Sequence, residues 1–150
     1  MASGGIGNTV MFDASSVVGD TVALTGTTFD VDACAPKDVM VWGGTGFSFN
    51  VTDPNYQVAG INVQYSLDGG GWITATAGGR FVVTRAAGEA GDEEEAPILF
   101  RLANVAPGTH TLDFRVILET LTPPGITGVA ELRLQRSLIT IDQGPGLRCC

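Results

Sequence analysis

The stretch from Ala106 to Asp142 constrains the fold of this chain most strongly, because apolar and polar residues alternate along it. A turn at Pro107–Gly108 opens the stretch, and a second alternating run follows a loop rich in proline and glycine. The apolar members, spaced two apart, are Leu112, Phe114, Val116 and Leu118, then Ala130, Leu132 and Leu134. A period of two is typical of half-buried antiparallel strands. The sequence therefore predicts a β scaffold in this part of the chain.

Shorter runs of the same kind occupy the rest of the chain and are separated by Gly, Pro, Asn and Asp. We expect strands within residues 21–28, 39–42, 47–51, 61–67, 72–74, 81–83, 98–102 and 138–141. An Asp-Gly step at Asp68–Gly71 predicts a hairpin turn with a longer loop than the two-residue kind. No segment has the pattern of an amphipathic helix. Many short strands with turn signals between them indicate an all-β sandwich or barrel. Their number and spacing favour an antiparallel β-sandwich.

A length of 150 residues, of which 44% are hydrophobic, fits one domain with a proper core. We expect residues 1–20 to form an extended N-terminal arm, residues 21–142 the sandwich, and residues 143–150 a tail. The arm is small, polar and glycine-rich, with one apolar patch at Val10, Met11 and Phe12. This patch is predicted to dock on a neighbouring protein and to order as it binds, with Phe12 as its anchor. The alternative is a frayed terminus with no role.

The formal net charge of −8, with Lys37 as the only lysine, disfavours several classes of partner. An acidic protein repels the phosphates of nucleic acids and the headgroups of anionic lipids. No run approaches the 18 consecutive apolar residues of a transmembrane helix. The N-terminus lacks the basic and apolar regions of a signal peptide. We therefore expect no nucleic acid and no membrane as partners, and synthesis in a cytoplasm.

Three cysteines, Cys34, Cys149 and Cys150, do not have the even number and spacing of a disulfide framework. The adjacent pair is expected to be a reduced tail. Oxidation, cross-linking of subunits or binding of a soft metal are the alternatives for it.

Few residues in the sequence are candidates for catalysis or metal binding. His110 is the only histidine, and no G-x-S-x-G motif accompanies it, so we expect a turn-edge histidine that hydrogen-bonds its neighbours rather than a catalytic base. The acidic residues Asp92–Glu95 lie in a predicted loop, residues 86–96, and lack the spacing of a calcium site. Trp42, Trp72 and Tyr65 are expected in the core or at an interface, with a sugar platform as the alternative. The sequence thus predicts no catalytic residue, no metal and no cofactor.

Polar faces of the last strands supply the candidates for a subunit interface. Arg115 and Arg133 could pair with Asp113 or Glu131 of another subunit, whereas on a monomer they would be solvated. Ile117 and Val129 project from the same predicted faces, and exposed apolar residues can mark a contact surface. The predicted interface residues are Arg115, Ile117, Val129, Glu131 and Arg133.

The turn A-P-G-T-H-T-L and the later pattern G-x-A-x-L-x-L-x-R-S-L-x-x-x-D resemble the C-terminal half of tumour-necrosis-factor-like jelly rolls. The pattern is similar to those in fibres, spikes and decoration proteins of tailed bacteriophages. The resemblance implies a jelly roll and a homotrimer, with Gly128–Leu134 as the penultimate strand and Leu138–Asp142 as the last, near the threefold axis. The segment Y-S-L-D-G-G-G-W also looks like bacterial immunoglobulin-like or fibronectin-like modules, which are usually monomeric, so the topology stays open.

This resemblance implies a function for the chain. We expect a structural virion surface protein of a tailed phage, which decorates or cements the capsid or forms a short head fibre as a homotrimer. Its partners would be copies of itself and the major capsid protein or another virion protein. The alternative is a carbohydrate- or receptor-binding module of a fibre or adhesin, with a host surface glycan as its ligand. An enzyme such as a glycan hydrolase is the least expected class.

Overall fold

The computed structural model describes residues 2–4, 9–12, 16–24, 26–32, 34–51, 57–75, 81–85, 93–122 and 130–144. Every regular element in these ranges is a β-strand. The strands are β1 (Ala2–Gly4), β2 (Thr9–Phe12), β3 (Thr21–Ala23), β4 (Thr27–Val31), β5 (Lys37–Val51), β6 (Gln57–Leu67), β7 (Ile73–Thr74), β8 (Phe81–Arg85), β9 (Glu93–Val105), β10 (Gly108–Thr122) and β11 (Ala130–Asp142). The predicted all-β class is confirmed.

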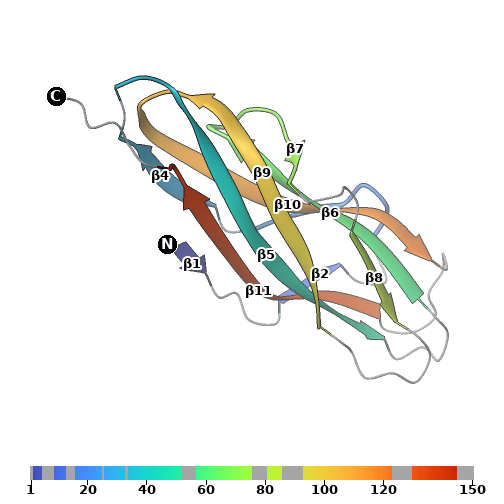
Figure 1. Cartoon of the computed structure of the whole chain (residues 1–150). Helices are drawn as coiled ribbons and strands as arrows, with labels where there is room; N and C mark the ends of the chain where they lie inside the picture. Colours follow the sequence, from blue (N-terminus) through green and yellow to red (C-terminus); the bar gives the residue numbers. More distant parts are fainter. Residues whose placement is uncertain are drawn as a thin grey trace.

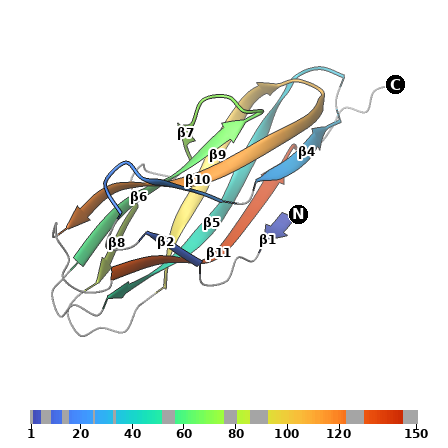
Figure 2. The ribbon, with the colours of Figure 1, turned by 180° about the vertical axis from the view of Figure 1, so that it is seen from behind.

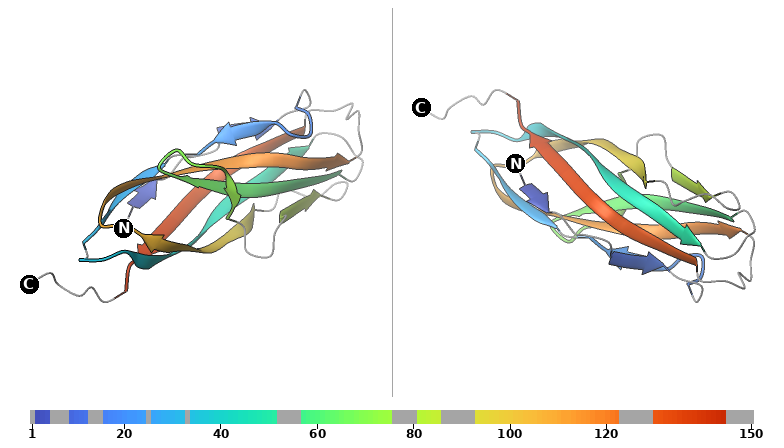
Figure 3. Two further views of the ribbon diagram at one scale, coloured as in Figure 1. Left: turned by 90° about the horizontal axis from the view of Figure 1, so that it is seen from above. Right: turned by 90° about the horizontal axis from the view of Figure 1, so that it is seen from below.

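The strands form two antiparallel sheets that pack as the layers of an elongated sandwich (Figure 1). The first sheet has the order β1-β11-β5-β9, and β2 also pairs with β11. The second sheet has the order β3-β10-β6-β7, with β4 also on β10 and β8 also on β6. Figure 2 views the molecule from behind, with the layer of β10 and β6 toward the reader. The two panels of Figure 3 show the two layers in turn.

The strand order is that of a jelly roll. Three pairs of short strands each share one partner strand: β1 and β2 pair with β11, β3 and β4 with β10, and β7 and β8 with β6. When each such pair is counted as one position, the chain has eight strand positions. In the first sheet the first position pairs with the eighth and the third with the sixth; in the second sheet the second pairs with the seventh and the fourth with the fifth. This pairing is the eight-stranded, double Greek-key arrangement of jelly rolls. It decides the topology that the sequence left open between a jelly roll and an immunoglobulin-like sandwich.

The core fills the space between the two sheets, because alternate residues of every long strand point inward. On β10 the inward residues are the four predicted from the alternation, and all are buried: Leu112, Phe114, Val116 and Leu118. Ile61, Val63 and Tyr65 of β6 oppose them across the ladder. The facing sheet contributes Val39, Val41 and Phe47 of β5 and Ala96, Ile98 and Leu102 of β9. Phe100 stacks on Tyr65 with 3.9 Å between ring centroids and joins the two sheets.

The strands of the first sheet are longer than their sequence patterns indicated. Residues 39–42 and 47–51 belong to the single strand β5, because β11 and β9 pair with both sides of the glycine-rich segment between them. The acidic residues Glu93–Glu95 begin β9 rather than lying in a loop. The prediction of a loop over residues 86–96 is therefore wrong from residue 93 onward. The predicted strand over residues 21–28 is divided between β3 and β4.

The end of the chain also differs from the prediction of two strands. Residues 130–142 form one strand, β11, whose register against β5 shifts between Leu134 and Arg136. An extra residue at a bulge reverses which positions face the core. Beyond this shift the odd-numbered Ile139 and Ile141 pack on the core, whereas the apolar residues before it in the sequence, Leu132 and Leu134, have even numbers.

Two segments of the predicted arm are edge strands of the sandwich. β1 pairs with residues 137–139 of β11, and β2 pairs with residues 132–134 of the same strand. Phe12 is 5% exposed and belongs to the core. In this arrangement a strand of the same chain, β11, supplies the hydrogen-bonding edge for β2, and docking of this segment on a neighbouring protein stays a prediction.

Cys34 is disulfide-bonded. The expectation that the cysteines form no disulfide is therefore wrong for this residue. Contacts between distant residues near this part of the chain are not revealed by spacing in the sequence: Gln143, just after β11, donates its side-chain amide to the carbonyl oxygen of Asp30 on β4. The chain's other two cysteines, Cys149 and Cys150, follow within a few residues in the sequence. They lie outside the described residues.

Stability should depend on the residues between the sheets and not on apolar residues outside them. We predict that Phe114→Ala lowers the free energy of unfolding by about 3–5 kcal/mol, because Phe114 is fully buried and a cavity remains. Ile73→Ala, at an exposed position of β7, should change it by less than about 0.5 kcal/mol. Urea unfolding followed by circular dichroism measures both. Equal effects of the two substitutions would contradict the sandwich core.

Candidate functional site

A polar cluster surrounds His110 at the end of the sandwich where the turn after β6 meets the start of β10. Nδ1 of His110 lies 2.7 Å from Oδ2 of Asp68, and Nε2 lies 2.8 Å from the carbonyl oxygen of Ala106. Oδ1 of Asp68 accepts a hydrogen bond of 2.8 Å from the backbone N–H of Thr111. The ring of Phe29 packs 5.6 Å from the imidazole. The predicted turn-edge histidine is confirmed.

The turn at Asp68 places its carboxylate toward β10. Asp68 and Gly69 both have positive φ, 50° and 72°, and the N–H of Gly70 donates to the carbonyl oxygen of Leu67. Such backbone angles are typical of the mirror-image turns of hairpins, and the Asp-Gly sequence favours them. The local sequence therefore fixes the direction in which the Asp68 side chain points.

Both neighbours of the His110 ring are hydrogen-bond acceptors, so the imidazolium, which donates from both nitrogens, fits the cluster best. The hydrogen bond to Asp68 raises the pKa of His110, and the bond to Ala106 adds to this. The same hydrogen bond from His110, followed by that from Thr111, lowers the pKa of Asp68. Since both ring nitrogens are already used, His110 is placed as a structural clamp and not as a free base.

The outer face of the second sheet carries a polar group around Arg115. Its Nε donates a 2.8 Å hydrogen bond to Oε1 of Gln64, and its guanidinium lies 4.3 Å from the centre of the Trp72 ring. Trp72 comes from the turn after β6, which folds over this face. Next to it, the amide of Asn62 donates to the carboxylate of Glu119. The side chain of Arg115 therefore has two partners within its own chain.

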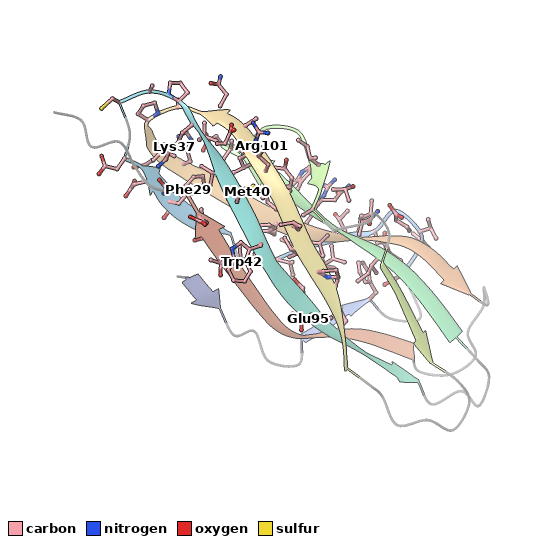
Figure 4. All side chains as sticks on the ribbon, viewed as in Figure 1. Phe29, Lys37, Met40, Trp42, Glu95 and Arg101 are labelled. Atoms are coloured by element: carbon pink, nitrogen blue, oxygen red, sulfur yellow. The ribbon has the colours of Figure 1, made fainter. Side chains whose placement is uncertain are left out.

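The outer face of the first sheet carries an exposed apolar strip. Met40 and Trp42 of β5 and Leu99 of β9 are 40%, 50% and 55% exposed. Trp42 and Leu99 stand opposite each other in the ladder, and Met40 stands opposite Arg101. Arg101 forms an ion pair with Asp38, whose carboxylate also accepts the N–H of Asn104 and thereby holds a bulge at positive φ. Figure 4 shows Met40, Trp42 and Arg101 along β5 and β9.

The predicted interface residues lie on strands of both sheets. Arg115 and Ile117 are on β10 in the second sheet, whereas Glu131 and Arg133 are on β11 in the first sheet. Val129 lies outside the described residues. Their role at a subunit interface stays a prediction, as does docking through Val10, Met11 and Phe12.

Tyr65 is in the core, which is one of the two places expected for the aromatic residues. Trp42 and Trp72 are half exposed on opposite sheets, so an interface and a sugar platform both stay open for them. The position of Trp42 was accessible to sequence reasoning. Val39 and Val41 alternate with Met40 and Trp42, so burial of the valines turns the other two residues outward.

Metal ligands do not converge in the part of the chain that the structure describes: no three His, Cys, Asp or Glu side chains there could hold an ion. Glu95 is exposed and lies over Gly44 of the neighbouring strand, and Asp30 accepts a 2.5 Å hydrogen bond from the hydroxyl of Thr109. In the same part of the chain, no helix has the length and apolar character needed to cross a membrane.

Comparison with known proteins identifies a structural likeness. No family model and no curated protein matches the sequence. A chain in the structure of infectious bursal disease virus, Gt strain, is similar with a TM-score of 0.50 and 14% identity, over 95% of this chain and 33% of that one. A chain of the Gx strain matches with a TM-score of 0.38 and 11% identity, over 93% and 38% of the two chains.

At 14% identity, the likeness to the Gt strain shows the fold alone. It agrees with the jelly-roll topology derived from the strand pairing. The chain spans about a third of the length of the chain that it matches. The tailed-phage resemblance of the sequence is not tested by this match and stays a prediction.

The His110 clamp should make stability depend on pH. The raised pKa of His110 stabilises the fold fully below its ordinary value of 6.5, and this stabilisation is lost as pH rises through the raised value. The lowered pKa of Asp68 contributes above its ordinary value of 3.8 and is lost at lower pH. We predict that His110→Gln destabilises the protein most between about pH 4 and 6.5 and least at pH 9. Urea unfolding across this range measures it, and a pH-independent difference would contradict the clamp.

Proposed function

We propose that this chain is a structural component of a virus particle, which works through contacts made by its sheet faces and edges. The observation that carries the proposal is the complete jelly-roll pairing, together with its likeness to a chain of a virus structure over nearly its whole length. The polar cluster around His110 holds the turn after β6 to the start of β10 through the hydrogen bonds of the imidazole. A rigid sandwich with its polar groups used internally suits a building block.

The finer proposal comes from the resemblance of residues 106–142 to phage decoration, spike and head-fibre proteins. In this proposal the chain decorates or cements the capsid of a tailed phage as a homotrimer, after synthesis in the host cytoplasm. The major capsid protein or another virion protein is its partner. The disulfide at Cys34, an exposed residue, supports a place on the virion surface, because disulfides persist on virions and other oxidised surfaces and are rare in a reducing cytosol.

Electron microscopy of the native source tests the location. Purified particles should bind gold-labelled antibodies against this chain over the shell for a decoration protein, or at projections for a head fibre. Particles lacking the chain, from a strain in which its coding sequence is deleted, serve as the control. Absence of label from intact particles, with the protein present only in the soluble fraction, would contradict a structural role.

A carbohydrate-binding module is the second candidate, and the exposure of two tryptophans favours it. Indole rings on a sheet face can stack on sugar rings, and Trp42 is the more open of the two because Arg115 covers Trp72. Binding to a glycan array that Trp42→Ser abolishes and Trp72→Ser preserves would support this function. Absence of binding to the array by the unaltered protein would count against it.

A further inference from the structure

The apolar strip on the first sheet is flanked by opposite charges. The register of the two ladders places three residues in one row across the sheet: Asp142 on β11, Met40 on β5 and Arg101 on β9. The neighbouring row holds Thr140, Trp42 and Leu99. We call these two rows the β5 face. Its centre is apolar, one edge carries an acid and the other carries a base.

Exposed large apolar residues elsewhere in the described chain do not form such a surface. Val17 and Val18 lie in a turn, and Trp72 and Ile73 lie in the loop and short strand after β6. Met40 and Trp42 instead lie along the long strand β5 (Figure 4), and Leu99 stands opposite Trp42 on β9. Trp, Met and Arg are enriched at protein interfaces, and clustered apolar residues rimmed by polar ones mark contact sites.

We propose that the β5 face binds the β5 face of a second copy of this chain, about a twofold axis parallel to the strands. Rotation about such an axis keeps the height of each row and exchanges its two sides. Met40 and Trp42 then meet Met40 and Trp42 of the partner at the centre. Arg101 of each copy reaches Asp142 of the other, so that two ion pairs flank the apolar centre. The row is therefore complementary to itself, as a twofold contact requires.

The side chains at the two edges are available for this contact. Arg101 is 60% exposed despite its ion pair with Asp38, and a guanidinium has donors for a second carboxylate. Asp142 is exposed and uses one carboxylate oxygen, Oδ1, to accept the N–H of Gly144. Neither intrachain contact has to break for the pairs between copies to form.

The β5 face is the centre of a larger contact. Its two rows span roughly 14 by 14 Å at the usual spacings of a sheet, so parts of the first sheet beside the two rows must also be buried in a stable dimer. Stable interfaces bury about 800 Å² on each side, and transient ones bury less. Two sheets that pack face to face with aligned strands form the same kind of layer that exists inside the sandwich.

This contact goes beyond the proposed virion role, and it is separate from the homotrimer, since a twofold face can join trimers or act alone. Sedimentation equilibrium of the purified protein at several micromolar concentrations tests it. We expect dimers, or hexamers if trimers also form. Trp42→Ser should weaken the twofold association roughly 30-fold or more, as loss of a central tryptophan does. Trp72→Ser is the matched control and should leave the association unchanged.

A charge exchange tests the geometry. Arg101→Asp and Asp142→Arg should each weaken the association about tenfold, because each places like charges opposite one another. The variant Arg101→Asp/Asp142→Arg, made in an Asp38→Asn background so that no carboxylate of the same chain repels the new aspartate, should restore it, since the pairs form again with reversed sign. Circular dichroism and urea unfolding verify that each variant is folded.

The outcomes separate this inference from the homotrimer. Hexamers that Trp42→Ser converts to trimers support both. Dimers that Trp42→Ser converts to monomers support the twofold face and count against the trimer. Trimers that Trp42→Ser leaves intact, or a monomer at every concentration, overturn the twofold face. Failure of the double charge variant to recover association overturns the proposed pairing.

Discussion

The burial of one apolar layer between two antiparallel sheets determines the rest of this structure. Leu112, Phe114 and Val116 on β10 can be buried only if the facing sheet presents its own apolar side, as β5 and β9 do. Because side chains of a strand alternate, burial of one set sends the other set outward. The polar group at Arg115 and the apolar strip at Trp42 are thus consequences of the same core, on opposite surfaces of the molecule.

Much of the fold was accessible to sequence reasoning, because period-two alternation is a local signal. The all-β class, the turn at Asp68 and the inward face of β10 follow directly from it. The errors arose where long-range pairing overrides local composition: glycines of β5 stay extended between two partner strands, and Glu93–Glu95 join β9. The strand order depends on contacts between distant residues, which no local pattern encodes. The same is true of the hydrogen bond from Gln143 to Asp30 and of the disulfide at Cys34.

The candidate site was predicted less well. The assignment of His110 to a turn edge needed only its neighbours in the sequence and is confirmed. The interface residues were chosen from polar positions of two strands, β10 and β11, that belong to different sheets, and their role stays a prediction. Trp42 was assigned to a core or interface, yet its significance came from the register that sets it beside Leu99 and next to the row of Met40 and Arg101. Surfaces across a sheet are a property of register, which the sequence alone leaves undefined.

This protein is then a structural unit whose function depends on which of its sheet faces is covered in the assembly. Oxidative footprinting of the native particle and of the isolated chain at low concentration measures this most directly. We expect Met40 and Trp42 to be protected in the particle, while Trp72 reacts equally in both samples. Equal reactivity of Met40 and Trp42 in the two samples would contradict the account, because the most apolar exposed face would then serve no contact.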